Sequence, residues 1–155
     1  MKRVKLTCGK YALIDDEDFD RIEKHSWHLV KIGSVFYAAT GIWNGSNMTT
    51  YYLHRFIMNT PKRLVTDHID GNGLNNQKSN LRVCTSSQNH MNTGLQKNNT
   101  SGYRGVMWYK RDKKWLAVIK IDKKLINLGK YKEKSKAIEI RSKAEKKYYK
   151  EFAQK

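Results

Sequence analysis

The stretch Val65-Thr66-Asp67-His68-Ile69-Asp70-Gly71-Asn72, followed by Asn80-Leu81-Arg82-Val83-Cys84, decides the fold of this chain of 155 residues. Its pattern predicts a strand that ends in Asp67-His68, then a polar loop rich in Gly and Asn, and then a second short strand over residues 81–84. Thr85 and Ser86 are both good N-caps, so a short helix should begin there and end by Gly94. A unit of strand, strand and helix with polar residues at these points can close around one hard cation.

Three polar side chains of this unit carry chemistry. Asp67 and Asn89 both offer oxygen, which suits Mg²⁺ or Mn²⁺ rather than zinc. His68 has an unperturbed pKa that allows it to accept a proton from water near neutral pH. The loop residues Asn72, Asn75 and Asn76 are instead expected to satisfy the backbone of their own loop, as Asn-rich loops often do.

These residues resemble the H-N-H endonucleases of the ββα-metal fold, in the subgroup carried by phages and mobile introns. The matching elements are Leu53-His54-Arg55, residues 67–72, Asn80-Leu81-Arg82 and Asn89, with 12 positions from His68 to Asn80 and 21 from His68 to Asn89. The resemblance implies that Asp67 and Asn89 bind one divalent cation, Mg²⁺ or Mn²⁺. It also implies that His68 activates the attacking water and that Asn80 ties the loop backbone so that His68 is aimed.

Two points of the resemblance have alternatives. The third family position is often His, and here it is Asn89, so a register in which the neighbouring His90 is the ligand is the alternative. Arg55 and Arg82 either contact phosphate or brace the fold.

Residues 1–62 predict a small antiparallel β scaffold. Residues 5–7 and 11–14 flank a turn at residues 8–10, and residues 35–42 and 48–53 flank a loop at residues 43–47. An acidic run at residues 15–18 precedes Phe19 and Ile22, which have helical spacing. Clustered carboxylates are compatible with a metal site, but we expect these to cap a helix and to complement its dipole.

The C-terminal part predicts a three-stranded antiparallel sheet with one packed helix. Residues 103–109, 115–121 and 125–131 have the pattern of strands, separated by polar turns at residues 110–114 and 122–124. Alternation directs Ala117 and Ile119 toward the helix and Val118 and Lys120 away from it, and it makes Trp108 and Trp115 core residues rather than stacking surfaces. Ser135 is the expected N-cap of a helix with the apolar stripe Ala137, Ile140, Ala144, Tyr148 and Phe152.

This part resembles the plant APETALA-type (ethylene-response-factor) DNA-binding domain, on residues 101–106, 114–120 and 128–131. The resemblance implies that the exposed face of the sheet enters the major groove. Leu125, Asn127 and Met107 stand where that family carries Arg, Trp and Arg, so base readout is not carried over and contact with phosphates is expected. The DNA-facing positions are Arg104, Tyr109, Lys110, Arg111, Lys120 and Asn127.

Charge points to the same class of partner. The net charge is +17, of which residues 95–155 contribute +13, with 19 Lys and Arg against 6 Asp and Glu. Such a field is typical of a protein that binds a polyanion, either nucleic acid or an anionic membrane. A membrane is disfavoured because the sequence has no long apolar run and no start like a signal peptide. Cys8 and Cys84 form no C-x-x-C pair, which fits a reducing, intracellular compartment.

The sequence therefore predicts an α+β protein. Residues 1–94 would be the scaffold and nuclease domain, with the ββα-metal core at about residues 63–94, residues 95–101 a linker, and residues 102–155 the DNA-binding domain. We expect a monomeric homing or phage-encoded endonuclease that nicks or cuts double-stranded DNA in the cytoplasm of a bacterial or phage-infected cell. The alternatives are a non-catalytic DNA-binding protein with a vestigial nuclease motif, and an RNA-binding protein with Tyr103 and Tyr109 as its platform.

Overall fold

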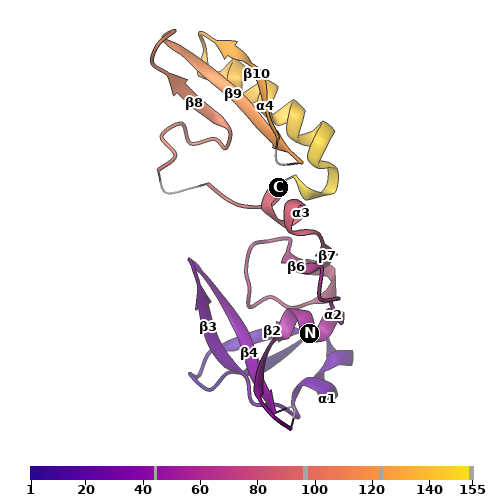
Figure 1. The fold of residues 1–155 in the computed structure, drawn as a ribbon. Helices are drawn as coiled ribbons and strands as arrows, with labels where there is room; N and C mark the ends of the chain where they lie inside the picture. Colours follow the sequence, from indigo (N-terminus) through magenta and orange to yellow (C-terminus); the bar gives the residue numbers. More distant parts are fainter. Residues whose placement is uncertain (44, 96–97, 123, 154–155) are drawn as a thin grey trace. The chain divides into compact units, whose positions relative to one another are not determined.

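The computed structural model describes residues 1–43, 45–95, 98–122 and 124–153. The chain divides into two compact units, Met1–Ser86 and Ser87–Lys155, which we describe separately (Figure 1). Both units combine small antiparallel sheets or hairpins with few helices, in agreement with the predicted α+β class. Parts of the predicted loop at residues 43–47, linker at 95–101 and turn at 122–124 lie outside the described residues, at Asn44, residues 96–97 and Lys123.

The first unit contains small antiparallel sheets joined by short helices. One sheet pairs β1 with β2, a second has the order β3-β4-β5, and a third pairs β6 with β7. The elements are β1 (Lys2–Lys5), β2 (Tyr11–Ile14), α1 (Phe19–Ile22), β3 (His28–Ile32), β4 (Val35–Trp43), β5 (Met48–Tyr52), α2 (Leu53–Met58), β6 (Val65–His68) and β7 (Leu81–Cys84).

The second scaffold hairpin and the β6–β7 pair are confirmed in antiparallel register, whereas the leading strand of the first hairpin lies at Lys2–Lys5 and not at residues 5–7. The sequence did not indicate β3, and it extended the strand before α2 through Leu53. In the structure α2 begins at Leu53 and ends at Asn59, which adopts the left-handed conformation (φ 45°, ψ 45°) that Asn tolerates at a helix C-terminus.

The acidic run has a different role from the predicted one. It forms a 3₁₀ turn at Asp16–Asp18, and Asp15 makes no side-chain capping bond. The Asp15 carboxylate instead accepts hydrogen bonds from the Lys78 backbone N–H (2.8 Å) and the Gln77 side chain (3.3 Å). Through Asp15, the acidic run therefore links the segment after β2 to the segment that precedes β7.

The core of the first unit lies where the small sheets meet the helices. Leu6, Ile14, Ile22, Trp27 and Leu53 are among its fully buried side chains. Trp27 also donates its indole N–H to the Ile22 carbonyl (2.9 Å), so this bulky side chain is buried without an unpaired donor. The core thus joins β1, β2 and α2, the elements on which the β6–β7 hairpin and its loop rest.

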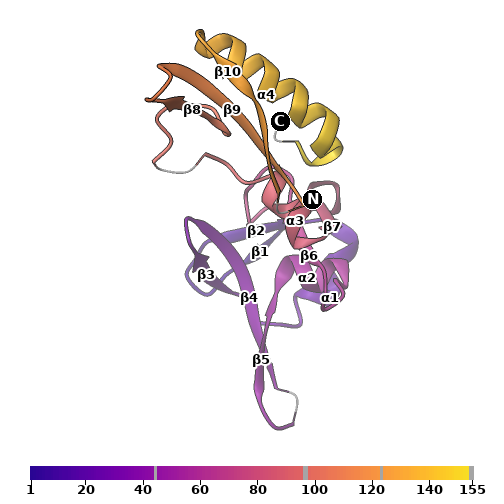
Figure 2. The ribbon, with the colours of Figure 1, turned by 45° about the horizontal axis from the view of Figure 1, so that its top comes forward.

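The second unit contains the predicted sheet and helix. Its strands, β8 (Val106–Tyr109), β9 (Lys114–Ile121) and β10 (Lys124–Tyr131), have the order β10-β9-β8. Figure 2 shows α4 (Lys134–Tyr149) lying along one face of this sheet. The buried side chains Ala117 and Ile119 pack toward α4, as alternation predicts. The short helix α3 (Ser86–Met91) precedes the sheet, and no helix among the described residues is long and apolar enough to cross a membrane.

Three details of this unit were predicted wrongly. The N-cap of α4 is Glu133 rather than Ser135. In its last turn Tyr149 is buried and Tyr148 is 41% exposed, because the buried face passes through Arg141, Ala144 and Tyr149. Trp108 is 44% exposed, since it packs edge-on against its cross-strand partner Trp115 (5.3 Å between ring centroids) rather than in the core.

Candidate active site

Asp67 and His68 end strand β6, and both side chains are buried, with exposed fractions of 5% and 6%. The register of the β6–β7 pair sets Asp67 opposite Arg82. Arg82 donates to the same carboxylate oxygen of Asp67, Oδ2, from Nε (2.8 Å) and from Nη2 (2.6 Å). The geometry favours the bracing role for Arg82, because a paired guanidinium fixes the plane of the Asp67 carboxylate.

The chain turns sharply after His68. The Gly71 N–H donates to the His68 carbonyl (2.9 Å), and Gly71 has a φ of 74°, a conformation that favours glycine. The Asp70 carboxylate accepts the Asn72 N–H (2.8 Å), and the Asn72 side chain accepts the Leu74 N–H (3.1 Å). Asn72 therefore satisfies the backbone of its own loop, as predicted.

Asn80 joins the two ends of this loop. Its side-chain oxygen accepts the Asp70 N–H (3.1 Å), and its amide nitrogen donates to the Asn75 carbonyl (2.8 Å) and to the Asp70 carboxylate (2.9 Å). The Asn80 backbone carbonyl accepts the Ile69 N–H (2.9 Å). These bonds hold the backbone directly after His68, which is the location that the predicted role of Asn80 requires.

The loop also rests on the scaffold sheets. Leu13 of β2 donates its N–H to the Leu74 carbonyl and accepts the Asn76 N–H, both at 2.8 Å. At Gly73, a Cβ atom would lie 2.4 Å from the Phe36 carbonyl and 2.7 Å from the Tyr37 ring. Gly73 therefore permits a close approach of the loop to β4 that a larger residue would prevent.

This approach surrounds His68 with polar and aromatic side chains. His68 Nε2 lies 3.2 Å from Asn76 Oδ1. The rings of His54 and Tyr37 lie 5.0 Å and 5.8 Å from the His68 ring, centroid to centroid. Since the Asn76 oxygen can only accept, the contact is a hydrogen bond when Nε2 carries the proton, so Asn76 favours the Nε2–H tautomer of His68. Burial lowers the pKa of His68 below its ordinary 6.5, so its imidazole is neutral at pH 7.

His54 is a second buried imidazole in this cluster. Its ring stacks on Tyr52 (5.6 Å, 17° between planes), and its Nδ1 has no hydrogen-bond partner among the described residues. Burial, followed by the positive charges that His68 and Arg55 can carry, lowers the pKa of His54 to about 3. His54 is therefore a permanently neutral neighbour of His68 at the pH of a cell.

Sequence reasoning gave no role in the site to Asn76, His54 or Tyr37. The prediction that Asn76 serves only its own loop was incomplete, because Asn76 is fully buried and its side chain contacts His68 as well as the Gly73 carbonyl (3.5 Å). Leu53-His54-Arg55 was part of the resemblance to the H-N-H endonucleases, but that resemblance did not indicate that the His54 ring packs against His68. No pattern in the sequence indicated Tyr37.

The predicted metal ligands fall in different units. Asp67 belongs to the first, whereas Asn89 lies on α3 and is half-buried in the second, beside the exposed His90. The pairing of Asp67 with Asn89 stays a prediction. Among the described residues no group of three or more His, Cys, Asp and Glu side chains is arranged to hold a metal. The predicted donors, one carboxylate and one amide oxygen, fit a hard cation that keeps several waters, as Mg²⁺ does.

Some of the predicted DNA-facing residues already make hydrogen bonds within the protein, and others are exposed. Arg55 donates to the carbonyls of Leu64 (2.8 Å), Thr60 and Pro61 (both 3.1 Å), which favours bracing of the segment after α2. Arg104 donates to backbone carbonyls at the end of α3. In the second unit, Lys110 and Arg111 are exposed in the turn between β8 and β9, Lys120 and Asn127 are exposed on β9 and β10, and Tyr109 of β8 is half-buried. Contact with DNA stays a prediction for all of them.

Comparison with known proteins finds similarity to HNH endonucleases in the segment that contains this geometry. Residues 51–91, from β5 through α3, match the family model described as HNH endonuclease. Protein 3.8 of Escherichia phage T7 is 39% identical over 67 residues, which cover 43% of this chain and 55% of that protein. An uncharacterized HNH endonuclease of Acanthamoeba polyphaga mimivirus is 33% identical over 97 residues, which cover 58% of this chain and 47% of that protein.

The chain thus spans about half the length of the curated relatives that it matches. No solved structure shows a significant match. Together the matches support a nuclease of the HNH class with relatives in a phage and in a mimivirus. HNH endonucleases generally use a divalent metal ion. None of these comparisons gives evidence for an APETALA-type domain, so that part of the predicted architecture stays a prediction.

Proposed function

We propose that this protein is a metal-dependent DNA endonuclease that hydrolyses phosphodiester bonds, with His68 as the general base. The observation that carries the proposal is a buried, neutral His68 next to Asp67, inside the segment that matches the HNH endonuclease family. A neutral imidazole is the form that accepts a proton, so the lowered pKa keeps His68 ready for this role at and below pH 7.

The residues around His68 have distinct tasks in this proposal. Asn76 holds the Nε2 edge of His68, which orients the imidazole that takes a proton from the attacking water. Asn80 and Gly71 fix the backbone that follows His68, so that the imidazole is oriented before substrate binds. His54 and Tyr37 pack against the ring and exclude water from its inner side.

Asp67 and Asn89 would hold one Mg²⁺ or Mn²⁺ ion, with the rest of its coordination left to water and to the phosphate. When bound, the ion would supply positive charge that stabilises the negative charge developing on the scissile phosphate and on the leaving 3′ oxygen. Arg82 supports Asp67 in this task by holding its Oδ2 atom.

Double-stranded DNA is the proposed substrate. The positive charge of residues 95–155 is suited to phosphate contacts, and Lys110 and Arg111 in the β8–β9 turn and Lys120 on β9 are exposed cations. One such active site in a monomer is suited to nicking one strand. The homing or phage-encoded role, and an intracellular location, belong to this proposal and are supported by the phage and mimivirus relatives.

The proposal is tested by incubating supercoiled plasmid with the full chain at low salt, with Mg²⁺, with Mn²⁺ or with EDTA. We expect conversion to the open circle in either metal and no conversion in EDTA. The rival proposal, a DNA-binding protein with a vestigial nuclease motif, predicts a mobility shift of the plasmid in all three conditions and no open circle. A mobility shift of RNA but not of plasmid would instead favour the RNA-binding alternative.

A further inference from the structure

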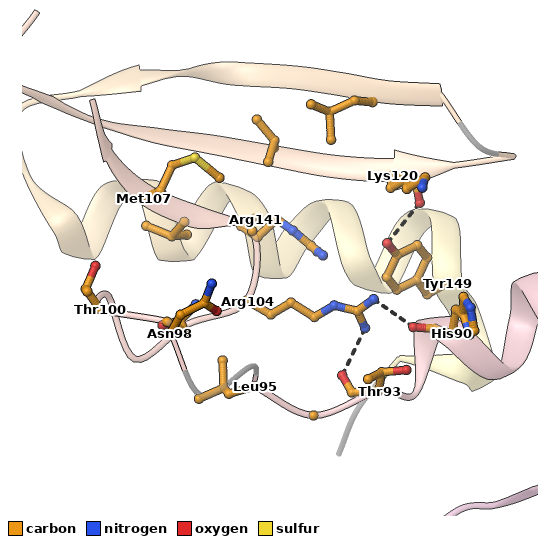
Figure 3. Close-up of a pocket in the computed structure, with 16 residues that line it drawn as sticks. His90, Thr93, Leu95, Asn98, Thr100, Arg104, Met107, Lys120, Arg141 and Tyr149 are labelled. Atoms are coloured by element: carbon orange, nitrogen blue, oxygen red, sulfur yellow. Dashed lines mark hydrogen bonds between the residues drawn. The ribbon is translucent and has the colours of Figure 1, made fainter. Parts of the chain in front are cut away.

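Arg104 lies two residues before β8, and its side chain reaches the end of α3. Its Nη1 donates to the carbonyls of Met91 (2.7 Å) and Thr93 (3.1 Å), and its Nη2 donates to the carbonyl of His90 (2.7 Å). Figure 3 shows the guanidinium lying against His90 and Thr93 in a cavity that the two residues line together with Arg104. The last carbonyls of a helix have no partner within the helix, so an arginine at this point satisfies several of them at once.

The backbone next to Arg104 is held against the sheet. The next residue, Gly105, has a φ of 72°, and its carbonyl accepts the Val118 N–H (2.7 Å). A Cβ atom on Gly105 would lie 2.4 Å from the Val118 carbonyl and 2.4 Å from Nε of the buried Arg141. The chain therefore passes so closely over β9 and α4 that the Arg104 backbone cannot move independently of the sheet.

The other end of the contact is the turn that contains Asn89. The Asn92 N–H donates to the Asn89 carbonyl (3.1 Å), and the Thr93 N–H donates to the His90 carbonyl (3.4 Å). A helix of six residues is marginal without tertiary contacts, because nucleation is costly and few bonds are gained. The bonds from Arg104 therefore add to the packing of Met91 against Ile119, Ala144 and Tyr149 in holding the end of α3.

We propose that Arg104 is a positioning residue for Asn89, so that the sheet of the second unit stabilises the metal-binding helix in addition to any contact with DNA. This inference rests on the proposed function, in which Asn89 is a metal ligand. It assigns Arg104 a task different from the DNA contact predicted from the sequence. A planar guanidinium suits the task because its donors form a rigid fork, which the ammonium of a lysine does not provide.

The test compares Arg104→Ala and Arg104→Lys with Arg111→Ala, which removes an exposed arginine from the same unit. Three quantities are measured on the full chain: Mn²⁺ affinity by calorimetry without DNA, the salt dependence of duplex affinity in EDTA, and hydrogen exchange of the amides of Asn92 and Thr93. Arg104→Lys keeps the charge and serves as the informative variant if Arg104→Ala does not fold.

We expect both Arg104 variants to lose about 10- to 100-fold in Mn²⁺ affinity, as is typical when a residue that supports a ligand is removed. Their Asn92 and Thr93 amides should exchange faster, and Arg104→Lys should leave the salt slope unchanged. Arg111→Ala should reduce that slope by about 0.9 and leave Mn²⁺ affinity unchanged.

Two results would overturn the inference. One is a pair of Arg104 variants with parental exchange at Asn92 and Thr93. The other is Arg104→Ala with parental Mn²⁺ affinity and a salt slope reduced by about 0.9, which would make Arg104 a phosphate contact. A parent protein that neither binds Mn²⁺ nor nicks plasmid would overturn the proposed function instead, and the exchange measurement would still decide whether Arg104 orders the turn.

Discussion

Arg82 and Asp67 are cross-strand partners, and two nitrogens of the arginine, Nε and Nη2, converge on one carboxylate oxygen at 2.8 Å and 2.6 Å. The pair joins β6 to β7 directly beside His68. Asp67 is buried and Arg82 is largely buried. Breaking the ion pair would therefore leave both charges unpaired and out of reach of solvent. The pair is therefore a structural support of the site as well as a neighbour of its chemistry.

Arg82→Ala should lower the free energy of unfolding by about 3–5 kcal/mol, because it leaves the buried Asp67 carboxylate without its cation. Urea unfolding in EDTA measures this loss. The double variant Asp67→Asn, Arg82→Ala should recover part of the stability, since the amide is neutral. A loss below about 1 kcal/mol, the size expected of a surface ion pair, would contradict a supporting role for the pair.

The buried His54 should make stability depend on pH. Its folded pKa is about 3 against 6.5 for the free side chain, so between these values the unfolded chain binds more protons. Stability is therefore lost as pH falls from 6.5 toward 3, with a slope of about 1.4 kcal/mol per pH unit from this residue.

His54→Phe keeps an aromatic ring against Tyr52 and removes the unpaired Nδ1. Urea unfolding from pH 4 to pH 7 should give a shallower slope for this variant, and it should be more stable than the parent at about pH 5. His28→Phe, at an exposed histidine, is the control and should keep the parental slope. An equal slope in His54→Phe and the parent would show that His54 is not buried in its neutral form.

Asn76 should influence the pH below which the cleavage rate falls, which we call the acid limb. Because burial lowers the pKa of His68, we expect the midpoint of the acid limb of the parental rate to lie below pH 6.5. Asn76→Asp adds a negative charge beside Nε2, which favours the imidazolium and moves the acid limb to higher pH. Asn72→Asp keeps the oxygen that accepts the Leu74 N–H and should leave the limb in place. Rates at saturating Mg²⁺ against pH distinguish the two, and equal shifts in both would refute the His68–Asn76 contact.

The fold was predictable where a local pattern sufficed. Alternation and turn residues located β6, β7 and the sheet of the second unit, because each is specified within a few residues of sequence. The helix α2 was not predicted, and its first residue, Leu53, was assigned to the preceding strand, since Tyr51-Tyr52-Leu53 has strand-like composition and the helix is fixed by packing of Leu53 and Ile57 in the core.

The site was predictable in its residues but not in its contacts. Asp67 and His68 stood out because a paired carboxylate and imidazole at a strand end carry chemistry. The contact of His68 with Asn76 depends on how the loop folds back onto Leu13 and Tyr37, which is set by long-range packing. The bracing bonds of Arg55 and Arg104 depend on the tertiary fold in the same way, so the family resemblances indicated phosphate or DNA contacts for them but not these bonds.

The register of the metal ligand is open to a paired test. Asn89 and His90 are adjacent on α3, and neighbouring helical residues point about 100° apart, so only one can face the cation. Asn89→Ala should lose metal-dependent cleavage, Asn89→Asp should retain more activity because it keeps an oxygen, and His90→Ala should keep most of it. An inactive His90→Ala together with an active Asn89→Ala would assign the ligand to His90 and favour Zn²⁺ or Ni²⁺.

The most direct measurement of the central claim is the rate of plasmid nicking in Mg²⁺ by the parent and by His68→Ala, with DNA affinity measured in EDTA. Loss of the general base should slow nicking by about a hundred- to ten-thousand-fold and leave the affinity nearly unchanged. Asp67→Ala should also abolish nicking, through loss of metal binding. Undiminished nicking by purified His68→Ala protein would contradict the assignment of His68 as the base that activates water.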